Sequence, residues 1–345
     1  MISHKRFLII FITATVFLVN CGPKEKEIFG REYTGTILGN PYVISTAGDS
    51  TDYQFEIDSI IRLIDINFSL SNPNSVVSKY NMYTQTDESM KFVDSSFVFG
   101  SVFNLAEDLN RRSNSFFDPT SNPLKREWFR IKFNQIAEEP NLDSLYEFVV
   151  FDSKVDLNEI YDESGKYKES HLRKKDSRIE LDLSSLGMAY GLDMISDMLL
   201  SKGLQQIKIT CLNQTICRGA GVPELNIVPL GITQDSADQK IRLINGAFSF
   251  KTTKEKQAMI DVTYGYPVDN EIVYVGVAAK SLVEAEVFSE SFMIMGFEQS
   301  SSWYEKNADS NVHSFMLFMK NNEISSASTI GFDEMLIVPD SITSK

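Results

Sequence analysis

Histidine and cysteine are scarce in this chain of 345 residues, which contains three of each. His4 falls in the apolar N-terminal region, so only His171 and His313 remain for a histidine-based metal cluster or a catalytic triad. The sequence also has no Walker loop, no G-x-G-x-x-G string and no C-x-x-C pair. These absences weigh against dehydrogenases, P-loop NTPases and thioredoxin-like proteins.

Positive charge is also in deficit. The chain has 33 Lys and Arg residues against 47 Asp and Glu residues, which gives a formal net charge of -14. Such a protein repels phosphate backbones at long range, so we expect no nucleic-acid partner. With 43% hydrophobic and 23% charged residues, the composition is that of a globular protein.

The one long apolar run lies at the N-terminus. Lys5 and Arg6 precede an apolar stretch over 7–19, and Cys21 follows with Leu18 three residues before it. This layout predicts a secretory signal peptide over 1–20, and the Leu and Cys spacing is similar to a bacterial lipobox. We therefore expect a lipid on Cys21, a tether over 21–30, and a protein held at the bacterial cell envelope, facing the periplasm or the outside. An uncleaved anchor, or a plain signal with a chance cysteine, remains the alternative.

The other two cysteines, Cys211 and Cys217, lie on a predicted strand, turn and strand. An exported protein could bridge them. A turn at 213–214 would put them out of direct register, so we favour two packed thiols over a disulfide.

Residues 31–340 contain no internal repeat and no linker, and they are predicted to form a single compact unit. Apolar residues recur at helical spacing over 53–64, 97–109, 188–203 and 283–296, and the last two of these end in glycine. Short β-rich runs cover 42–45, 147–151, 207–217, 225–230, 241–250, 272–279, 313–319 and 335–338. This alternation predicts an α+β fold of mixed or antiparallel sheet with flanking helices, and it leaves a division into two sub-domains open.

Four segments carry a recognisable pattern. They read FSLSNPNSVVSKYN at 68–81, FFDPTSNPL at 116–124, LDLSSLGMAYGLD at 181–193 and AEVFSESFMIMG at 285–296. In this order they resemble the FAD:protein FMN transferase family, whose members are exported and often lipid-anchored. The resemblance spans about 33–338.

The resemblance implies a phosphoryl-transfer reaction. FAD is split at its diphosphate, FMN passes to a Thr or Ser hydroxyl of a target protein, and AMP leaves. A magnesium ion would bridge the diphosphate oxygens and neutralise charge as the bond breaks. FAD, Mg²⁺ and a target protein are therefore the expected substrate, metal and partner.

Contacts to the flavin nucleotide are implied at positions that match the family. These positions are Leu38, Phe116, Phe117, Asp118, Ser184, Tyr190 and Met259. The residues themselves also permit a structural explanation. The two phenylalanines could pack in the core while Asp118 caps a turn, and Ser184 and Tyr190 could be a helix cap and a packed aromatic.

Glu286 and Glu290 are four residues apart on a predicted helix, so their carboxylates share one face. Like charges so placed destabilise a helix, and a cation between them would reverse that effect. The resemblance implies a metal site at this point, with Ser289 and the carbonyl of Gly187 as further ligands. The alternative is a pair of solvated glutamates.

Several positions depart from the family pattern. GMA at 187–189 stands where Ala-Lys-Gly is usual, LNQ at 212–214 replaces a Gly-Gly-acid turn, and FKT at 250–252 replaces Thr-Ser-Gly. AMIDVTYGYP at 258–267 replaces His-x-x-Asp-Pro-x-Thr-Gly-x-Pro, so Ala258 stands where the family's histidine is usual. Side chains now occupy places where bare backbone would approach a ligand. We favour a transferase, and a non-catalytic relative that binds flavin or a partner protein stays open.

Overall fold

The computed structural model describes residues 30–48, 50–135, 138–219, 224–227 and 239–337. The predicted signal peptide, Cys21 and the tether up to residue 29 lie outside these ranges. No helix within them is long and apolar enough to cross a membrane.

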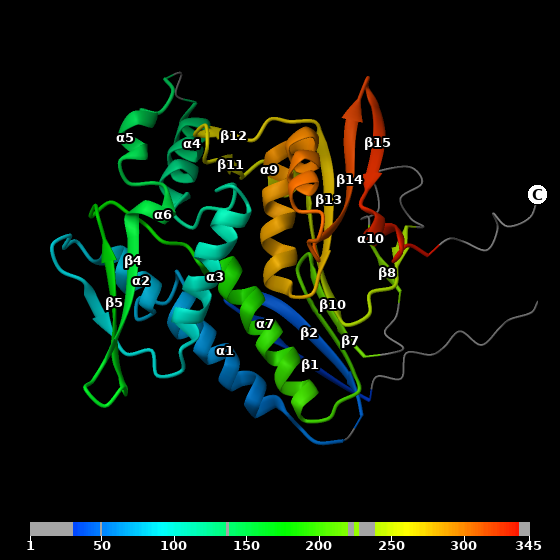
Figure 1. Ribbon diagram of the computed structural model, residues 1–345, viewed down its shortest axis with the longest axis horizontal. Helices are drawn as coiled ribbons and strands as arrows, with labels where there is room; N and C mark the ends of the chain where they lie inside the picture. Colours follow the sequence, from blue (N-terminus) through cyan, green and yellow to red (C-terminus); the bar gives the residue numbers. More distant parts are fainter. Residues whose placement is uncertain (1–29, 49, 136–137, 220–223, 228–238, 338–345) are drawn as a thin grey trace, which may run out of the picture.

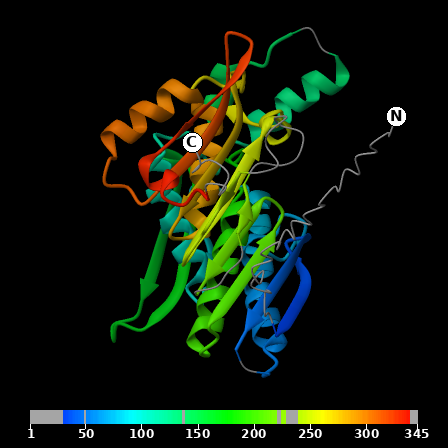
Figure 2. The same ribbon diagram turned by 90° about the vertical axis from the view of Figure 1, so that its right-hand side faces the viewer.

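The centre of the molecule is a sheet of eight strands, and each neighbouring pair is antiparallel (Figures 1 and 2). In spatial order the strands are β1 (Arg31–Ile37), β2 (Asn40–Ala47), β6 (Gln206–Cys211), β7 (Gln214–Arg218), β10 (Gly246–Thr252), β13 (Ile272–Ala279), β14 (His313–Lys320) and β15 (Glu323–Ser328). Inner strands such as β13 are buried on both faces. The sheet is therefore covered on both sides.

Helices cover one face of this sheet (Figure 1). α7 (Ser184–Ser201) and α9 (Leu282–Lys306) pack directly on the sheet. α1 (Gln54–Phe68) packs on α7 and also contacts β1, and α3 (Val98–Arg112) packs on α1 and α7. The first half of α9 is buried almost all round, as expected of a helix enclosed by protein rather than lying at a surface.

A smaller sheet lies beyond the helices, on the side away from the main sheet (Figure 1). Its strand order is β3-β5-β4, with β3 at Met90–Phe92, β5 at Tyr167–Lys174 and β4 at Val155–Tyr161. The remaining elements are α2 (Val76–Met82), α4 (Asn122–Asn134), α5 (Leu142–Tyr146), α6 (Phe151–Lys154), β8 (Leu225–Asn226), β9 (Lys240–Ile241), α8 (Thr253–Lys256), β11 (Ile260–Asp261), β12 (Tyr266–Pro267) and α10 (Ile330–Asp333).

The apolar core has two parts, one on each face of the main sheet. The larger part lies under the helices, and the smaller part includes Phe248, Tyr274 and Phe332. Cys211 belongs to the larger part and Cys217 to the smaller. Both thiols are free, which confirms the prediction of packed thiols.

The α+β class is confirmed, and each of the four predicted helices is present. The predicted end of the fourth helix at Gly296 is only an interruption, because α9 resumes and continues to Lys306. Gly296 has φ 76° and ψ 176°. Asn270 Nδ2 donates to the carbonyls of Met293 and Ile294, and Glu271 accepts the N–H of Phe297, so side chains preceding β13 satisfy the backbone at the break.

The predicted strand over 147–151 is wrong. Val150 has φ 91°, its N–H is bound by Thr120 Oγ1, and the N–H of Phe151 is bound by Asp118. Side chains therefore take the donors that a strand neighbour would need.

Two other strand predictions were too long. The run over 241–250 is divided at Asn245, whose φ is 51°, into β9 and β10. Of the run over 335–338, the described part makes one isolated bridge, between Leu336 and Ile241. The predicted strand over 225–230 begins as β8, and residues 228–230 lie outside the described ranges.

Candidate functional site

A cavity of about 380 Å³ opens where five parts of the fold meet: the β1–β2 turn, the start of α7, the β6–β7 turn, the β10–α8 junction and α9. Its lining residues are Leu38, Asn40, Ser184, Ser185, Met188, Leu212, Asn213, Gln214, Lys251, Lys254, Glu255 and Glu286. Two ammonium groups and two carboxylates therefore line one small space.

The two hairpin turns at this cavity hold apolar residues in left-handed backbone. Leu38 has φ 48° and Leu212 has φ 52°, and the Leu212 side chain is 62% exposed. Left-handed backbone is unfavourable for a bulky residue and has to be held by its surroundings. Both turns thus place a leucine at the cavity at some conformational cost.

A buried ion pair lies at the base of the cavity. Lys251 Nζ is 2.7 Å from both carboxylate oxygens of Glu286, and Ser249 Oγ donates to Glu286 Oε2 at 2.7 Å. Burial raises the pKa of Glu286, but Lys251 and the hydrogen bonds from Ser249 and Gln214 outweigh it, so the pKa lies below its ordinary value. The carboxylate is ionised and neutralised by the chain itself.

Sequence reasoning did not assign Lys251 and Ser249 to the site. They are two residues apart on β10, so their side chains share the face that α9 covers. The available signal was a serine and a lysine alternating with apolar residues in the strand sequence GAFSFKT. Two polar residues on a covered face require a polar partner, and Glu286 is that partner.

Gln214 adds an unsatisfied group to the cavity. Its side chain is only 3% exposed and hydrogen-bonds Glu286. Its Oε1 is buried without a hydrogen-bond partner among the described residues. Buried polar atoms are rarely left unpaired, so this oxygen is available to a donor from a bound molecule.

Residues of the first recognised segment fix the chain just ahead of α7. Asn81 Nδ2 donates to the carbonyl of Leu181 at 2.9 Å, and Asn81 Oδ1 accepts the N–H of Leu181 at 2.7 Å. Ser75 and Ser78 both donate to the carbonyl of Ser69, which closes the loop before α2. These polar side chains bind main chain rather than facing the cavity.

The second recognised segment, 116–124, also contacts the chain just ahead of α7. Asp118 accepts hydrogen bonds from the N–H and Oγ1 of Thr120 and from the N–H of Phe151. Burial raises the pKa of Asp118, and these donors oppose the rise. The carbonyl of Pro119 accepts the N–H of Asp182.

Asp182 in turn accepts the N–H and Oγ of Ser184 through Oδ1. Asn81, Asp118, Pro119 and Asp182 thus link three of the four recognised segments, and we call the hydrogen bonds they make the motif network. The motif network sets where α7 begins at the cavity.

The predicted nucleotide-contacting residues are not all brought together. Leu38 and Ser184 line the cavity. Phe116 and Phe117 are 7% and 6% exposed and belong to the larger core, and the carboxylate of Asp118 is bound by Thr120 in its own turn and by the N–H of Phe151. This is the packed arrangement that the sequence left open as the alternative.

Two further predicted residues lie apart from that cavity. Met259 is buried before β11, and its carbonyl accepts the N–H of Val268. Tyr190 lines a second hollow of about 750 Å³ beside the start of α9. Neither belongs to the lining of the smaller cavity.

The predicted metal ligands also point in different directions. Only Glu286 lines the cavity. The hydroxyl of Ser289 lies 2.9 Å from the carbonyl of Glu286, and Glu290 is paired with Lys125 at 3.9 Å. Gly187 lies inside α7, where a Cβ would meet the ring of Phe68 at 2.5 Å, so close packing of α7 on α1 accounts for this glycine. In the described part of the chain, no three His, Cys, Asp or Glu side chains form a group that could hold a metal.

The hollow beside Tyr190 contains a carboxylate that caps α9. Asp193 accepts the N–H groups of Leu282 and Val283, and its Oδ1 lies 3.5 Å from Arg218. Burial raises the pKa of Asp193 to about 6, because desolvation outweighs the helix N–H groups and Arg218. Asp193 therefore joins α7 to the start of the helix that carries Glu286.

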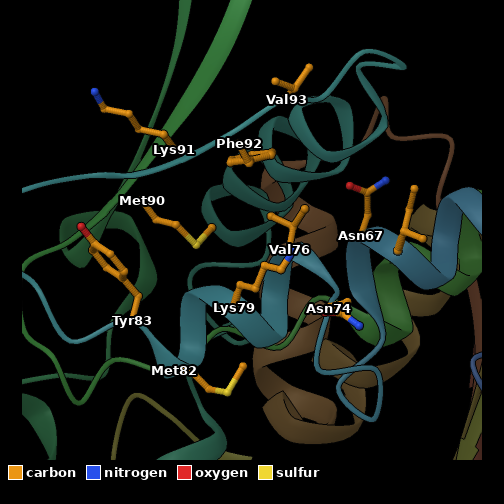
Figure 3. A pocket seen from close by; sticks show the side chains of 11 residues that line it. Asn67, Asn74, Val76, Lys79, Met82, Tyr83, Met90, Lys91, Phe92 and Val93 are labelled. Carbon is orange, nitrogen blue, oxygen red and sulfur yellow. The ribbon is translucent and has the colours of Figure 1, made fainter.

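A third hollow, of about 600 Å³, lies between α1, α2 and β3 (Figure 3). Lys79 and Lys91 stand among mainly apolar side chains there, including Met82, Met90 and Val93. None of the residues singled out from the sequence as site residues lines it. The cavity beside Glu286 is therefore the candidate site.

Comparisons with known proteins identify the family of the chain. A sequence model of the ApbE family matches residues 30–315. The FAD:protein FMN transferase of Vibrio cholerae is 23% identical over 316 residues, which cover 87% of this chain and 90% of that protein. The protein of the same name from Haemophilus influenzae is 20% identical over 348 residues, covering 95% of this chain and 98% of its own.

Solved structures show the same fold. The flavin transferase ApbE of Vibrio cholerae superposes with a TM-score of 0.71 at 21% identity, covering 89% of this chain and 99% of that one. The Pseudomonas stutzeri flavinyl transferase ApbE gives a TM-score of 0.70 at 19% identity, covering 90% and 97%.

Proposed function

This chain belongs to the ApbE family, and we propose that it is an FAD:protein FMN transferase, which moves FMN from FAD to a Thr or Ser hydroxyl of a target protein. The observation that carries the proposal is the cavity at the start of α7, where Lys251, Lys254 and the unpaired Gln214 Oε1 meet. Its volume of about 380 Å³ is in the range of small-molecule sites.

The charges at this cavity suit a diphosphate. The first turn of α7 has N–H groups without partners inside the helix, and a helix N-terminus favours anions. Ser184 and Ser185 come from that turn, and Lys254, which also lines the cavity, comes from α8. A diphosphate bound there would meet positive potential from both elements.

In the proposed reaction, the acceptor hydroxyl oxygen attacks the phosphorus on the FMN side of the FAD diphosphate. The bond from that phosphorus to the bridging oxygen breaks, AMP leaves, and the hydroxyl proton passes to AMP or to solvent. The residues of the cavity would hold and orient the diphosphate, which is how proteins accelerate phosphoryl transfer in general. Gln214 Oε1 would accept a hydrogen bond from an N–H or O–H of the nucleotide.

The experiment is to incubate the purified protein with FAD and an acceptor domain, with and without Mg²⁺. We expect release of AMP, measured by chromatography, together with the mass of one FMN on the acceptor, measured by mass spectrometry. Replacing the acceptor Thr or Ser with Ala is the control. If neither product forms under either condition, the transferase proposal fails.

A second candidate function is flavin binding without transfer. It is favoured by Ala258, which stands where the family pattern has a histidine, and by the positions of the described histidines, His171 and His313, which do not line the cavity. Tight binding of FAD with no AMP released would select this function over the first.

Magnesium, which the family resemblance implies, does not fit the residues as they are arranged. Glu286 is bound to Lys251, Glu290 is paired with Lys125, and Ser289 lies against the main chain of its own helix. A divalent magnesium ion needs several oxygen ligands in near-octahedral geometry, and the predicted ligands do not provide it here.

We further propose that the protein is lipid-anchored through Cys21 in the bacterial cell envelope. The support is the basic, apolar and cysteine pattern over 5–21. Metabolic labelling with a fatty-acid analogue tests it, since the label should attach to the wild-type protein and not to Cys21→Ala. Equal labelling of both proteins would contradict it.

A further inference from the structure

Both carboxylate oxygens of Glu286 are already bound by groups of the chain. Lys251 Nζ lies 2.7 Å from each of them, and Ser249 Oγ adds a second donor on Oε2. We infer that the ammonium group of Lys251 replaces a divalent cation at Glu286, so that this site takes up no divalent metal and the nucleotide binds without one. The metal-free binding of FAD rests on the proposed function, whereas the exclusion of metal from Glu286 does not.

The geometry leaves a metal ion no place at this carboxylate. Glu286 and Lys251 are 5% and 8% exposed, so the pair is shielded from water. A divalent ion bound to Glu286 would have to displace Lys251 Nζ and then stand beside a buried positive charge. Repulsion between two cations at such a distance is strong where water is excluded.

The other implied ligands do not compensate for this. Glu290 lies with Lys125, 3.9 Å from its ammonium group, and the Ser289 hydroxyl lies 3.2 Å from Ser249 Oγ, inside the hydrogen-bonded cluster around Glu286. Every acidic group at the proposed metal position therefore has a lysine beside it. The chain supplies positive charge where a bound metal would otherwise be needed.

The rest of the cavity is consistent with a built-in cation. Glu255 is turned toward the backbone N–H and Oγ1 of Thr252 and toward Asn213. Lys254 forms no ion pair with the residues that the structure describes, so it leaves a positive charge facing the cavity. An anionic ligand would thus meet one neutralised and one available ammonium group.

The first test measures metal uptake directly. Mn²⁺, detected by electron paramagnetic resonance, is titrated into the wild-type protein, Lys251→Ser and Lys254→Ser, and Mg²⁺ is used as competitor. We expect no tight Mn²⁺ site in the wild type or in Lys254→Ser, and one Mg²⁺-competed site in Lys251→Ser. Lys254→Ser is the matched control, because it removes a lysine from the same cavity without uncovering Glu286.

A Mn²⁺ site in the wild type that Glu286→Gln abolishes would overturn the inference. If Lys251→Ser does not fold, the wild-type titration still decides, since that variant is not needed to detect such a site. If Lys251→Ser folds and takes up no Mn²⁺, then Lys251 does not hold the place of a metal, and the inference is also overturned.

The second test measures FAD binding by the wild type in excess EDTA and in millimolar Mg²⁺. We expect dissociation constants that agree within about threefold, and a difference of more than about tenfold in favour of Mg²⁺ would overturn metal-free binding. Absence of FAD binding under both conditions contradicts the proposed function and metal-free binding together. The Mn²⁺ titration alone would then decide whether Glu286 excludes metal.

Discussion

Two regions of the molecule use polar residues in different ways. In the motif network, Asn81, Asp118 and Asp182 bind main-chain groups of neighbouring loops. At the cavity, Lys251 and Glu286 bind each other. The first arrangement holds backbone in place for any ligand, while the second determines the charge that a ligand meets.

The segments that match the family pattern and those that depart from it differ in the same way. Asn81 and Asp118 lie in segments that match the family, and their partners are backbone groups that every sequence possesses. Lys251 lies in a segment that departs from it, and its partner is a side chain. A positioning network can persist while the chemistry of the site it positions changes.

The comparison between the motif network and the cavity is tested most strongly by removing one member of the Lys251–Glu286 pair. Lys251→Met leaves Glu286 as a buried charge without its partner, so we expect the free energy of unfolding to fall by about 3–5 kcal/mol. The double variant Lys251→Met/Glu286→Met removes both charges and should regain most of this. Denaturant unfolding measures both, and a single variant as stable as wild type would show that the pair does not depend on mutual neutralisation.

In the motif network the corresponding change is Asp118→Ala. It leaves the buried N–H groups of Thr120 and Phe151 without acceptors, so we expect a loss of about 3 kcal/mol in the free energy of unfolding. Asp118→Asn keeps one acceptor oxygen, so its free energy of unfolding should fall by less. Equal losses in the two variants would mean that the side-chain volume, and not the hydrogen bonds, is what matters.

Asn81→Ala separates positioning from stability. It removes two hydrogen bonds to Leu181 ahead of α7, so we expect a loss of about 2 kcal/mol, together with weaker FAD binding because the first turn of α7 is less well fixed. Asn134→Ala, on the exposed end of α4, is the control. Unchanged FAD affinity in a folded Asn81→Ala protein would show that the motif network does not affect binding at the cavity.

The smallest expected effect is on pH dependence, at Asp193, which joins α7 to α9. Its pKa is about 6 in the folded protein against an ordinary value of 3.8. The folded protein therefore binds more protons between these values, and this group makes the free energy of unfolding fall as the pH rises through that window.

Asp193→Asn cannot ionise and serves as the reference. As the pH is lowered from 6 to 5, the free energy of unfolding of the wild type should rise by about 1 kcal/mol relative to this variant. Above pH 7 the difference between the two proteins should hardly change with pH. Thermal unfolding of both proteins across this range measures the difference. A wild type that instead loses stability relative to the variant on acidification would show that the helix N–H groups dominate over desolvation.

Much of the fold follows from periodicity in the sequence. The four helices were predictable because their apolar residues repeat at helical spacing, and Ile272–Ala279 was predictable as a strand because it is β-rich and short. The hairpin of β4 and β5 was missed since its strands are rich in polar residues, as in YKESHLRK. The segment 147–151 has the apolar composition of a strand, which explains the wrong prediction. Asp118 and Thr120, which are distant in sequence, accept its backbone N–H groups, so these cannot pair with a neighbouring strand.

The candidate site was predictable only in part. Glu286 and Ser184 were reached through the family pattern, and both line the cavity. Asp118 could not be assigned from sequence, because the same carboxylate can face a ligand or cap a turn, and only tertiary contacts decide. The pairing of Lys251 with Glu286 joins residues 35 apart in the chain, and no local pattern connects them.

The enclosure of the first half of α9 has a consequence for how the protein opens. Between 285 and 295 every residue except Glu290 is buried, with the main sheet on one side and α7 on another. Amide hydrogens in such a segment exchange with solvent only when large parts of the structure come apart. In deuterium exchange we expect these amides to be among the slowest in the molecule and those of the β4–β5 hairpin among the fastest. Glu286 therefore lies in the part of the chain that undergoes the least local opening.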